Sequence, residues 1–280
     1  MNAKLASRSG RLAGGWVVTA VFCFPIYLAV VNAFKANAQI KSDPLGLPNP
    51  FTFSNVITAL SRPDHLIQTG LVNSVVITSA TVALLIPLSS ATSLWLFERS
   101  ARVKGILTGI FALGLMIPPQ VGLQPTVQVL KAMGLMNTYP GLVLVGISGG
   151  YFAFAVFVYV GFLHTVPKEI LDSARVDGAG DLRVWWSIVM PLMRPATITV
   201  AIFVGLWTWN DFLGPLIILG PTQGQTITVA MYLSLGASAV STDYGQVYAI
   251  TLIAALIPLI AYLFCQREFV AGLTSGAAKG

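Results

Sequence analysis

The chain has 280 residues, of which 55% are hydrophobic and only 9% charged, with a formal net charge of +6. Soluble domains carry about 25% charged residues, so this composition excludes an ordinary soluble protein and indicates a polytopic membrane protein. The distribution of lysine and arginine among the loops of such a protein explains the positive net charge, so the charge does not indicate nucleic-acid binding. Cys23 and Cys265 are interpreted as small apolar residues, not as metal ligands or a disulfide.

The first predicted membrane span covers residues 12–34, an uncharged stretch that follows Lys4, Arg8 and Arg11. It is too long for the apolar region of a secretory signal peptide and long enough to cross a bilayer. We therefore interpret it as an uncleaved helix that begins in the cytoplasm. Residues 35–65 hold several prolines among polar residues, which indicates an external loop.

The next three spans are predicted at residues 71–96, 105–130 and 141–163. The third contains Pro118 and Pro119, which cannot both lie in the interior of an unbroken helix. A broken helix at membrane depth is tolerated only against protein or a water-filled cavity. The break therefore either borders a translocation path or is a loop or a packed kink.

Residues 166–195, called the charged segment below, place eight charged side chains between two apolar runs. Pro167 suits the first turn of a helix, which Gly178 and Gly180 are expected to end. Asp181 is expected to cap a second helix, and Pro191 is expected to stop or bend that helix. The charged segment is thus predicted to be a compact two-helix protrusion in water.

Small residues give this protrusion a candidate docking face. In a continuous helix, the spacing of three and four residues would stack four side chains on one face: Leu171, Ala174, Gly178 and Leu182. Because two of them are small, another backbone or a bulky side chain could approach closely there. The alternative is an ordinary amphipathic loop that packs on its own protein.

The fifth and sixth spans are predicted at residues 196–219 and 244–266, separated by an external polar loop at 221–243 and followed by a tail at 267–280. Six spans place both termini on one side of the membrane. The proposed cytoplasmic pieces then hold twelve lysines and arginines and the outer pieces four, as the positive-inside rule requires. This count places the charged segment in the cytoplasm.

Asp211 is the acidic residue that falls inside a predicted span, about 24 Å along a helix from Arg194. An ionisable group at such a depth is a candidate functional residue. Asn210, Trp207 and Trp209 beside it supply hydrogen-bonding and ring-stacking groups that suit a sugar. The alternative is that Asp211 reaches the outer interface and that the tryptophans form a membrane belt.

The charged segment resembles the EAA loop of ATP-binding-cassette importer permeases. That pattern is Glu-Ala-Ala, three residues, Gly, nine residues, Ile, any residue and Leu-Pro, and every spacing holds here at Asp172, Ser173, Ala174, Gly178, Ile188, Val189, Met190 and Pro191. Asp172 for Glu, Ser173 for Ala and Met190 for Leu depart from it. The resemblance implies a coupling helix that fits a cleft on an ATPase subunit.

Two further stretches resemble the MalG-type permeases of carbohydrate importers: residues 209–213 in the fifth span and the C-terminal tail. By itself the tail reads as flexible, and its glycines lack the spacing of a Walker A loop. The resemblance implies that it reaches between the ATPase subunits, with the contacting residues Gly272, Leu273, Thr274, Gly276 and Lys279. With residues 134–138, the resemblance covers essentially the whole chain.

The resemblance implies an all-α polytopic membrane protein with six transmembrane helices and a type I ABC importer permease fold, in the cytoplasmic membrane of a prokaryote with both termini cytoplasmic. Its function would be to translocate a sugar or oligosaccharide. Its partners would be a second, homologous MalF-type permease, an ATPase dimer and an extracytoplasmic sugar-binding protein. The chain itself would bind no cofactor, because ATP and Mg would be bound by the partner ATPase.

Other functions remain open at this point. One is an importer permease for a non-sugar solute such as glycerol phosphate or a polyamine. Another is an ion-coupled secondary transporter, although a relay formed by Asp211 alone is a poor one. No Ser/His/Asp set, paired carboxylates or metal cluster is apparent, and His65 and His164 are too far apart in the predicted topology to share a metal. We therefore predict no enzyme, and the sequence does not identify the sugar.

Overall fold

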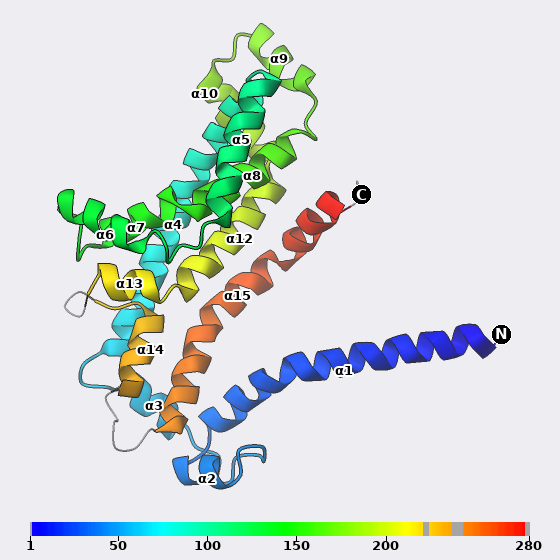
Figure 1. Ribbon diagram of the computed structural model, residues 1–280. Helices are drawn as coiled ribbons and strands as arrows, with labels where there is room; N and C mark the ends of the chain where they lie inside the picture. Colours follow the sequence, from blue (N-terminus) through cyan, green and yellow to red (C-terminus); the bar gives the residue numbers. More distant parts are fainter. Residues whose placement is uncertain (1, 221–223, 237–242, 278–280) are drawn as a thin grey trace. The chain divides into compact units, whose positions relative to one another are not determined.

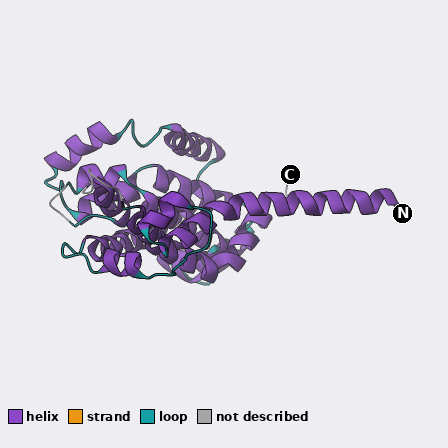
Figure 2. Ribbon diagram, turned by 90° about the horizontal axis from the view of Figure 1, so that it is seen from below, coloured by secondary structure: helices purple, strands orange, loops and turns teal. Residues whose placement is uncertain are grey.

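The computed structural model describes residues 2–220, 224–236 and 243–277, and within them the side chains of residue 12 and of residues 14–266, apart from 235 and 236 (Figure 1). All regular secondary structure in these residues is helical (Figure 2), so the prediction of an all-α fold is confirmed for the described chain. The first eight helices are α1 (Asn2–Ala33), α2 (Asn37–Ser42), α3 (Ser54–Leu60), α4 (Leu66–Phe97), α5 (Ala101–Met116), α6 (Leu123–Ala132), α7 (Tyr139–Ser148) and α8 (Gly150–Leu163).

The helices that follow are α9 (Lys168–Val176), α10 (Asp181–Val184), the π-helical η1 (Trp185–Val189), α11 (Met190–Leu192), α12 (Arg194–Asn210), α13 (Leu213–Ile218), α14 (Ile227–Gly236) and α15 (Tyr244–Ala277). The chain divides into two compact units. The first unit contains residues 1–68 and 230–257, and the second contains residues 69–229 and 258–280.

In the first unit, the buried Asn55 ties the start of α3 to the end of α1. Its side-chain amide donates to the carbonyl oxygens of Ala33 and Lys35, at 2.9 and 2.7 Å. The side chain of Lys35 is fully buried and donates to the carbonyl oxygen of Asp43 at 2.8 Å. These bonds satisfy backbone groups that the chain exposes where α1 ends, and they order the loop that follows it.

The second unit contains several buried apolar clusters, and one of them includes residues of the charged segment. Helix α8 packs against α5, α7 and α12. Buried side chains of α4, α8 and α12 meet in that cluster, which we call the central core: Leu85, Leu94, Phe97, Ala155, Tyr159, Leu163, Ala196, Val200 and Val204. Residues of the charged segment join the same core, as described below. The second unit therefore packs the charged segment and three long helices as one body.

Proline and aspartate residues determine where two predicted spans break. Helix α5 ends at Met116, directly before the Pro118–Pro119 pair, and α6 begins only at Leu123. Helix α12 ends at Asn210 because Pro215 lacks an N–H group and its ring would clash with the carbonyl group of Asp211 in a continuing helix. The carbonyl oxygen of Asp211 instead accepts a hydrogen bond of 2.7 Å from the hydroxyl group of Thr228.

Fewer of the described helices are long and apolar enough to span a membrane than the six spans predicted from the sequence. Three are long and apolar enough, namely Gly14–Ala33, Leu66–Phe97 and Tyr244–Gln266. The total rises to five if two bent pairs, α7 with α8 at 42° and the end of the charged segment with α12 at 79°, are each counted as one span. The predicted span at 105–130 does not pass, because the two prolines divide it.

The structure also corrects two predicted loops. The expected polar loop at 221–243 contains α14, whose Ile227, Val229 and Ala230 are fully buried. The sequence of α14 is apolar, but polar residues lie on both sides of it, and for this reason the whole stretch was predicted to be a loop. The tail, expected to be flexible, continues α15 as helix to Ala277, although the side chains beyond residue 266 lie outside the described residues.

Candidate functional site

Gly178 ends the first helix of the charged segment through a specific backbone motif. Its φ angle is +84°, a left-handed conformation that favours glycine because it lacks Cβ. Its N–H group donates to the carbonyl oxygen of Arg175, and the N–H group of Ala179 donates to that of Ala174, both at 3.0 Å. These two bonds form a Schellman motif, so the sequence has a structural reason for glycine at this position.

The inner face of the charged segment belongs to the central core. Leu171 of α9, Val184 of α10, Val189 of η1 and Met193 are each at most 2% exposed and pack with the core side chains of α4, α8 and α12. Ala174 packs against the same core. Burial of each large side chain stabilises its position by roughly 1.5–3 kcal/mol, so the charged segment is firmly seated.

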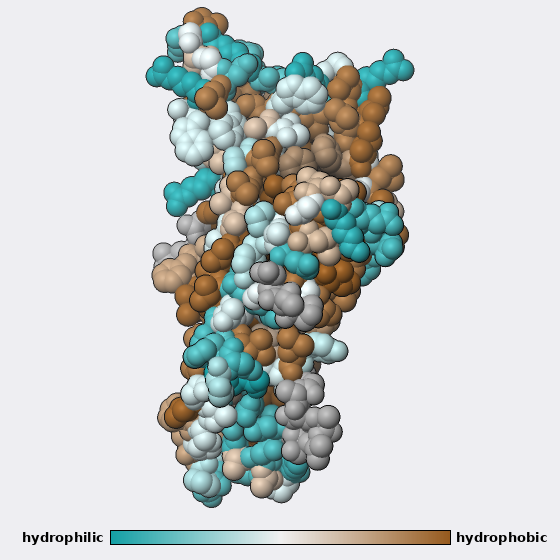
Figure 3. Space-filling model, turned by 90° about the vertical axis from the view of Figure 1, so that its left-hand side faces the viewer, coloured by the Kyte–Doolittle hydropathy of each residue, from teal (hydrophilic) through white to brown (hydrophobic). Residues whose placement is uncertain are grey.

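The outer face of the same segment is open. Val176, Leu182 and Trp186 are 87%, 75% and 63% exposed, and Asp172 and Ser173 lie beside them in solvent. No described atom lies within 4 Å of the position that a Cβ atom on Gly178 would occupy. In the space-filling view, hydrophilic side chains gather at the upper end, where α9 and α10 lie (Figure 3). Exposed apolar side chains within such a polar surface are typical of a protein-interaction site.

Three details of the charged segment differ from the sequence prediction. Leu171 and Ala174 face the core whereas Gly178 and Leu182 face solvent, so the four do not share a face, because the turn at Gly178 reverses the chain. Asp181 does not cap α10; Gly180 is the cap residue. The helix continues past Pro191 to Leu192, because the wide π-helical turn η1 accommodates the proline, and the bend follows at Met193.

Ion pairs join the charged segment to itself and to α4. The guanidinium group of Arg175 contacts the carboxylates of Glu98 at 2.5 Å and Asp181 at 3.1 Å. The indole N–H of Trp185 donates to the hydroxyl group of Ser90 at 3.1 Å. Sequence reasoning counted these charges but missed the contacts, because 77 residues separate Arg175 from Glu98 and no local spacing indicates their pairing.

The four residues predicted to line a substrate path do not gather in one place. Trp207 joins Tyr151, Phe154 and Phe203 in a cluster with ring centroids 4.8–5.7 Å apart. Trp209 is buried, and the exposed Asn210 donates to the carbonyl oxygen of Leu206 on its own helix. The cluster was not predicted, and the aromatic residues at 151, 154, 203 and 207 were its signal in the sequence.

Asp211 has a clear structural role at the helix break. Its carboxylate accepts a hydrogen bond of 3.2 Å from the N–H group of Gly214, in the first turn of α13. A Cβ atom on Gly214 would come within 2.3 Å of the Asp211 carboxylate, so a larger residue there would displace this carboxylate from its position. The side chain is half-buried, and its role in transport stays a prediction.

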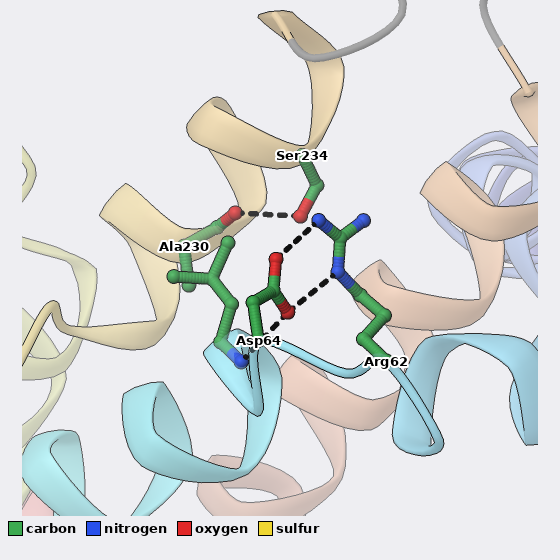
Figure 4. Close-up of polar contacts among 5 residues, drawn as sticks. Arg62, Asp64, Ala230 and Ser234 are labelled. Atoms are coloured by element: carbon green, nitrogen blue, oxygen red, sulfur yellow. Dashed lines mark hydrogen bonds and ion pairs between the residues drawn. The ribbon is translucent and has the colours of Figure 1, made fainter.

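A polar pocket lies in the first unit, lined by Thr58, Ser61, Arg62, Pro63, Asp64 and Gln246. Arg62 and Asp64 form a two-point ion pair at 3.1 and 2.7 Å, and Asp64 also accepts from the N–H group of Leu66 at the start of α4 (Figure 4). The hydrogen bond from Arg62 lowers the pKa of Asp64 to about 2. Because these groups satisfy one another, they brace the start of α4.

Other predicted features lie outside the site or outside the described residues. The side chains of Gly272, Leu273, Thr274 and Gly276 are not described, and Lys279 lies wholly outside the described residues. Among the described residues, no group of three His, Cys, Asp or Glu side chains could hold a metal ion. The ring of His164 lies edge-on to Phe97, with centroids 5.5 Å apart, which is a packing contact.

Comparison with known proteins identifies related chains. A family model described as "Binding-protein-dependent transport system inner membrane component" matches residues 83–267. The chain is 30% identical over 265 residues to the melibiose/raffinose/stachyose import permease protein MelC of Bacillus subtilis, covering 94% of both chains. It is 29% identical to the glucose import system permease protein GlcU of Saccharolobus solfataricus, covering 94% of this chain and 93% of that protein.

The fold has solved counterparts. One is a chain of a bacterial ABC transporter involved in the import of the acidic polysaccharide alginate, with a TM-score of 0.80 and 18% identity, covering 95% of this chain and 97% of that one. Another is a chain of a bacterial alginate ABC transporter in complex with an alginate pentasaccharide-bound periplasmic protein, with a TM-score of 0.67. The fold is therefore that of ABC importer permeases, as the sequence predicted.

Proposed function

Because this chain belongs to the family of binding-protein-dependent transport system inner membrane components, we propose that it is the permease subunit of an ATP-binding-cassette importer for a sugar or oligosaccharide. The observation that carries this proposal is the charged segment. It combines the spacing of an EAA loop with an open outer face and an inner face seated in the central core. A segment of this kind can receive a force and pass it to the helices.

We assign the driving step to a partner. A dimer of ATPase subunits binds ATP and Mg²⁺, and this chain hydrolyses nothing itself. Closure of that dimer pushes on the outer face of the charged segment, around Gly178, Asp172 and Ser173. Because Leu171 and Met193 are buried in the central core, the segment moves with α4, α8 and α12 and does not slide over them. The bundle then changes between inward-facing and outward-facing states.

The remaining partners and the location follow from the same proposal. A second, MalF-type permease completes the path, and an extracytoplasmic binding protein delivers the solute. The alginate transporter complexed with its periplasmic protein supports this arrangement by analogy of fold. The distribution of lysine and arginine supports a multi-pass protein of the prokaryotic cytoplasmic membrane, with both termini and the charged segment in the cytoplasm.

The aromatic cluster on α8 and α12 supports a carbohydrate as the solute. Trp207 is 37% exposed, so one part of its ring is free while the rest packs on Phe154. Binding sites for small molecules are lined mainly by aromatic and apolar groups with a few polar ones. The relatives named for melibiose, raffinose and stachyose and for glucose agree with this assignment.

Glycerol phosphate is the second candidate solute. The chain is 29% identical over 258 residues to the sn-glycerol-3-phosphate transport system permease protein UgpE of Yersinia pestis, covering 89% of this chain and 90% of that protein. An anionic solute would favour cationic side chains along its path. The six predicted spans of this chain contain no lysine or arginine, which favours a neutral solute.

Reconstitution tests the proposal. The permease is purified with its co-purifying ATPase and second permease, placed in proteoliposomes, and supplied with its binding protein outside and ATP inside. We expect uptake of radiolabelled melibiose or glucose that requires both ATP and the binding protein. Uptake driven by a proton or sodium gradient without ATP would show a secondary transporter instead. Uptake of glycerol 3-phosphate alone would identify the second candidate.

A further inference from the structure

Arg175 joins three elements at the base of the charged segment. It lies on α9 and pairs with Glu98, directly after α4, and with Asp181 at the start of α10. The side chains of Arg175 and Glu98 are 34% and 32% exposed, so this pair is partly shielded from water, whereas Asp181 is 88% exposed. The hydrogen bond to Glu98 raises the pKa of Arg175 further above its usual value, so its guanidinium group stays protonated at neutral pH.

A second contact fixes the same segment about 12 Å further along α4, since Ser90 precedes Glu98 by eight residues. Ser90 is fully buried, and its hydroxyl group accepts the indole N–H of Trp185. Among the described residues, the side chains of the charged segment that bond beyond it are those of Trp185, which bonds to Ser90 of α4, and Arg175, which bonds to Glu98 directly after α4. The ammonium group of Lys168 also lies 5.5 Å from the ring of Phe97, the last residue of α4.

The far half of α4 holds a different part of the second unit. The side-chain amide of Asn73 donates to the carbonyl oxygen of Gln225 at 3.1 Å, and the hydroxyl group of Ser74 accepts the N–H group of Ile227 at 2.9 Å. Ser74 and Ile227 are 2% and 0% exposed. Residues 224–228, called the far segment below, are therefore bonded to α4 through buried polar groups, which are costly to leave unpaired.

Helix α4 is continuous between these two sets of contacts. Sixteen residues separate Ser74 from Ser90, which is about 24 Å of helix. Pro87 lies in this helix without breaking it. The neighbouring pairs α7 with α8 and α12 with α13 are each interrupted, and α5 ends before the two prolines. A continuous helix can carry a displacement along its axis, whereas an interrupted one can bend at its break.

From these contacts we propose that Arg175 is a positioning residue that fixes the charged segment on α4, and that α4 transmits displacement of this segment to residues 224–228. This inference deepens the proposed function and rests on it. The ATPase partner pushes on the charged segment, the Arg175–Glu98 pair and the Trp185–Ser90 bond keep it on α4, and the far segment moves with the other end of the helix. Arg175 thus acts through Glu98 and touches neither ATP nor the solute.

The first experiment measures coupling, as ATP hydrolysed per solute imported, in proteoliposomes containing the complete importer. Arg175→Glu places a third carboxylate beside those of Glu98 and Asp181 and should lower uptake about fivefold while ATP hydrolysis continues, as expected for a partly shielded ion pair. The exchanged pair Arg175→Glu with Glu98→Arg should recover coupling, which a purely local structural defect would not do. Arg102→Glu is the matched control, because Arg102 is exposed at the start of α5.

The second experiment tests transmission along α4. Ser74→Ala removes the acceptor for the N–H group of Ile227 and should also reduce uptake relative to ATP hydrolysis. If the two ends act in series, Arg175→Glu combined with Ser74→Ala should be no worse than the worse single variant. Losses that multiply would show independent effects and would overturn the role of α4.

The outcomes separate this inference from the proposed function. If wild-type importer shows no ATP-dependent uptake, the proposed function fails and the inference fails with it. If wild type imports normally but Arg175→Glu and Glu98→Gln both keep normal coupling, only the inference fails. Should Arg175→Glu not assemble in the membrane, Glu98→Gln gives the same test, because it removes the same ion pair without adding a like charge.

Discussion

Substitution of Gly178 gives the sharpest test of the docking role. Glycine could be needed there for its positive φ angle or for the close approach of a partner, and different substitutions distinguish these two reasons. Its φ angle of +84° costs an L-residue about 1–2 kcal/mol. A Cβ atom would meet no described atom within 4 Å, so Gly178→Ala adds no clash inside the described chain. Burial of Leu171 and Val184 in the central core stabilises the segment by roughly 1.5–3 kcal/mol each, so the alanine variant should stay folded.

We therefore expect a graded series. Gly178→Asn should behave almost as wild type, because asparagine tolerates the left-handed conformation. Gly178→Ala should show a modest loss of uptake from backbone strain alone. Gly178→Arg has the same backbone cost but adds a long, charged side chain to the outer face, and it should abolish uptake and release the ATPase.

The assay is retention of the ATPase on affinity-purified permease, together with uptake in proteoliposomes and a check of membrane insertion for each variant. If the alanine and arginine variants lose equal amounts of uptake and the asparagine variant loses none, the whole effect comes from backbone strain at residue 178. ATPase retention and normal uptake by Gly178→Arg would refute docking at this face altogether.

Three further predictions concern other parts of the molecule. Arg62→Gln should raise the pKa of Asp64 from about 2 toward its usual 3.8, as followed by the pH titration of carbon-13-labelled aspartate in detergent, with Asp64→Asn for assignment. Because the folded-state pKa of this carboxyl group is lowered, the stability it contributes is present above pH 3.8 and is lost as the pH falls toward about 2. Met193→Ala should lower the free energy of unfolding by about 2–5 kcal/mol, whereas the neighbouring, partly exposed Leu192→Ala should cost clearly less in the same thermal melts. Asp211→Asn preserves the carbonyl acceptor that caps the turn but removes the charge, so a raised KM for uptake with unchanged ATP per solute is expected, and a wild-type KM would leave Asp211 a purely structural role.

Local chemistry predicted much of this fold. The breaks at Pro118–Pro119 and after Gly178 follow from the missing N–H group of proline and from the left-handed conformation that glycine allows. The apolar run of α4 and the EAA spacing are likewise visible in sequence alone. The helix breaks depend on residues within about four positions of each other, which is the range that helix hydrogen bonds cover, and the other two features are continuous patterns along one stretch of sequence.

Features that depend on distant residues could not be predicted. Arg175 lies on α9 and Glu98 follows α4, and nothing in the sequence around either residue indicates its partner. The residues Trp207, Trp209, Asn210 and Asp211 were grouped because they are close in sequence, but their contacts in the structure differ. Trp207 joins α8 in the aromatic cluster, whereas Asp211 turns toward α13.

The two faces of the charged segment explain why one short stretch can both bind a partner and transmit its motion. Val176 and Leu182 leave apolar surface in water, so covering them on a partner is favourable at about 25 cal/mol per Å². Displacing Leu171 or Met193 from the central core would instead cost the burial energy of each side chain and open a cavity. A force on the outer face therefore costs less free energy when the segment and α4 move together than when the segment separates from α4. The Arg175–Glu98 pair adds to the cost of separating them.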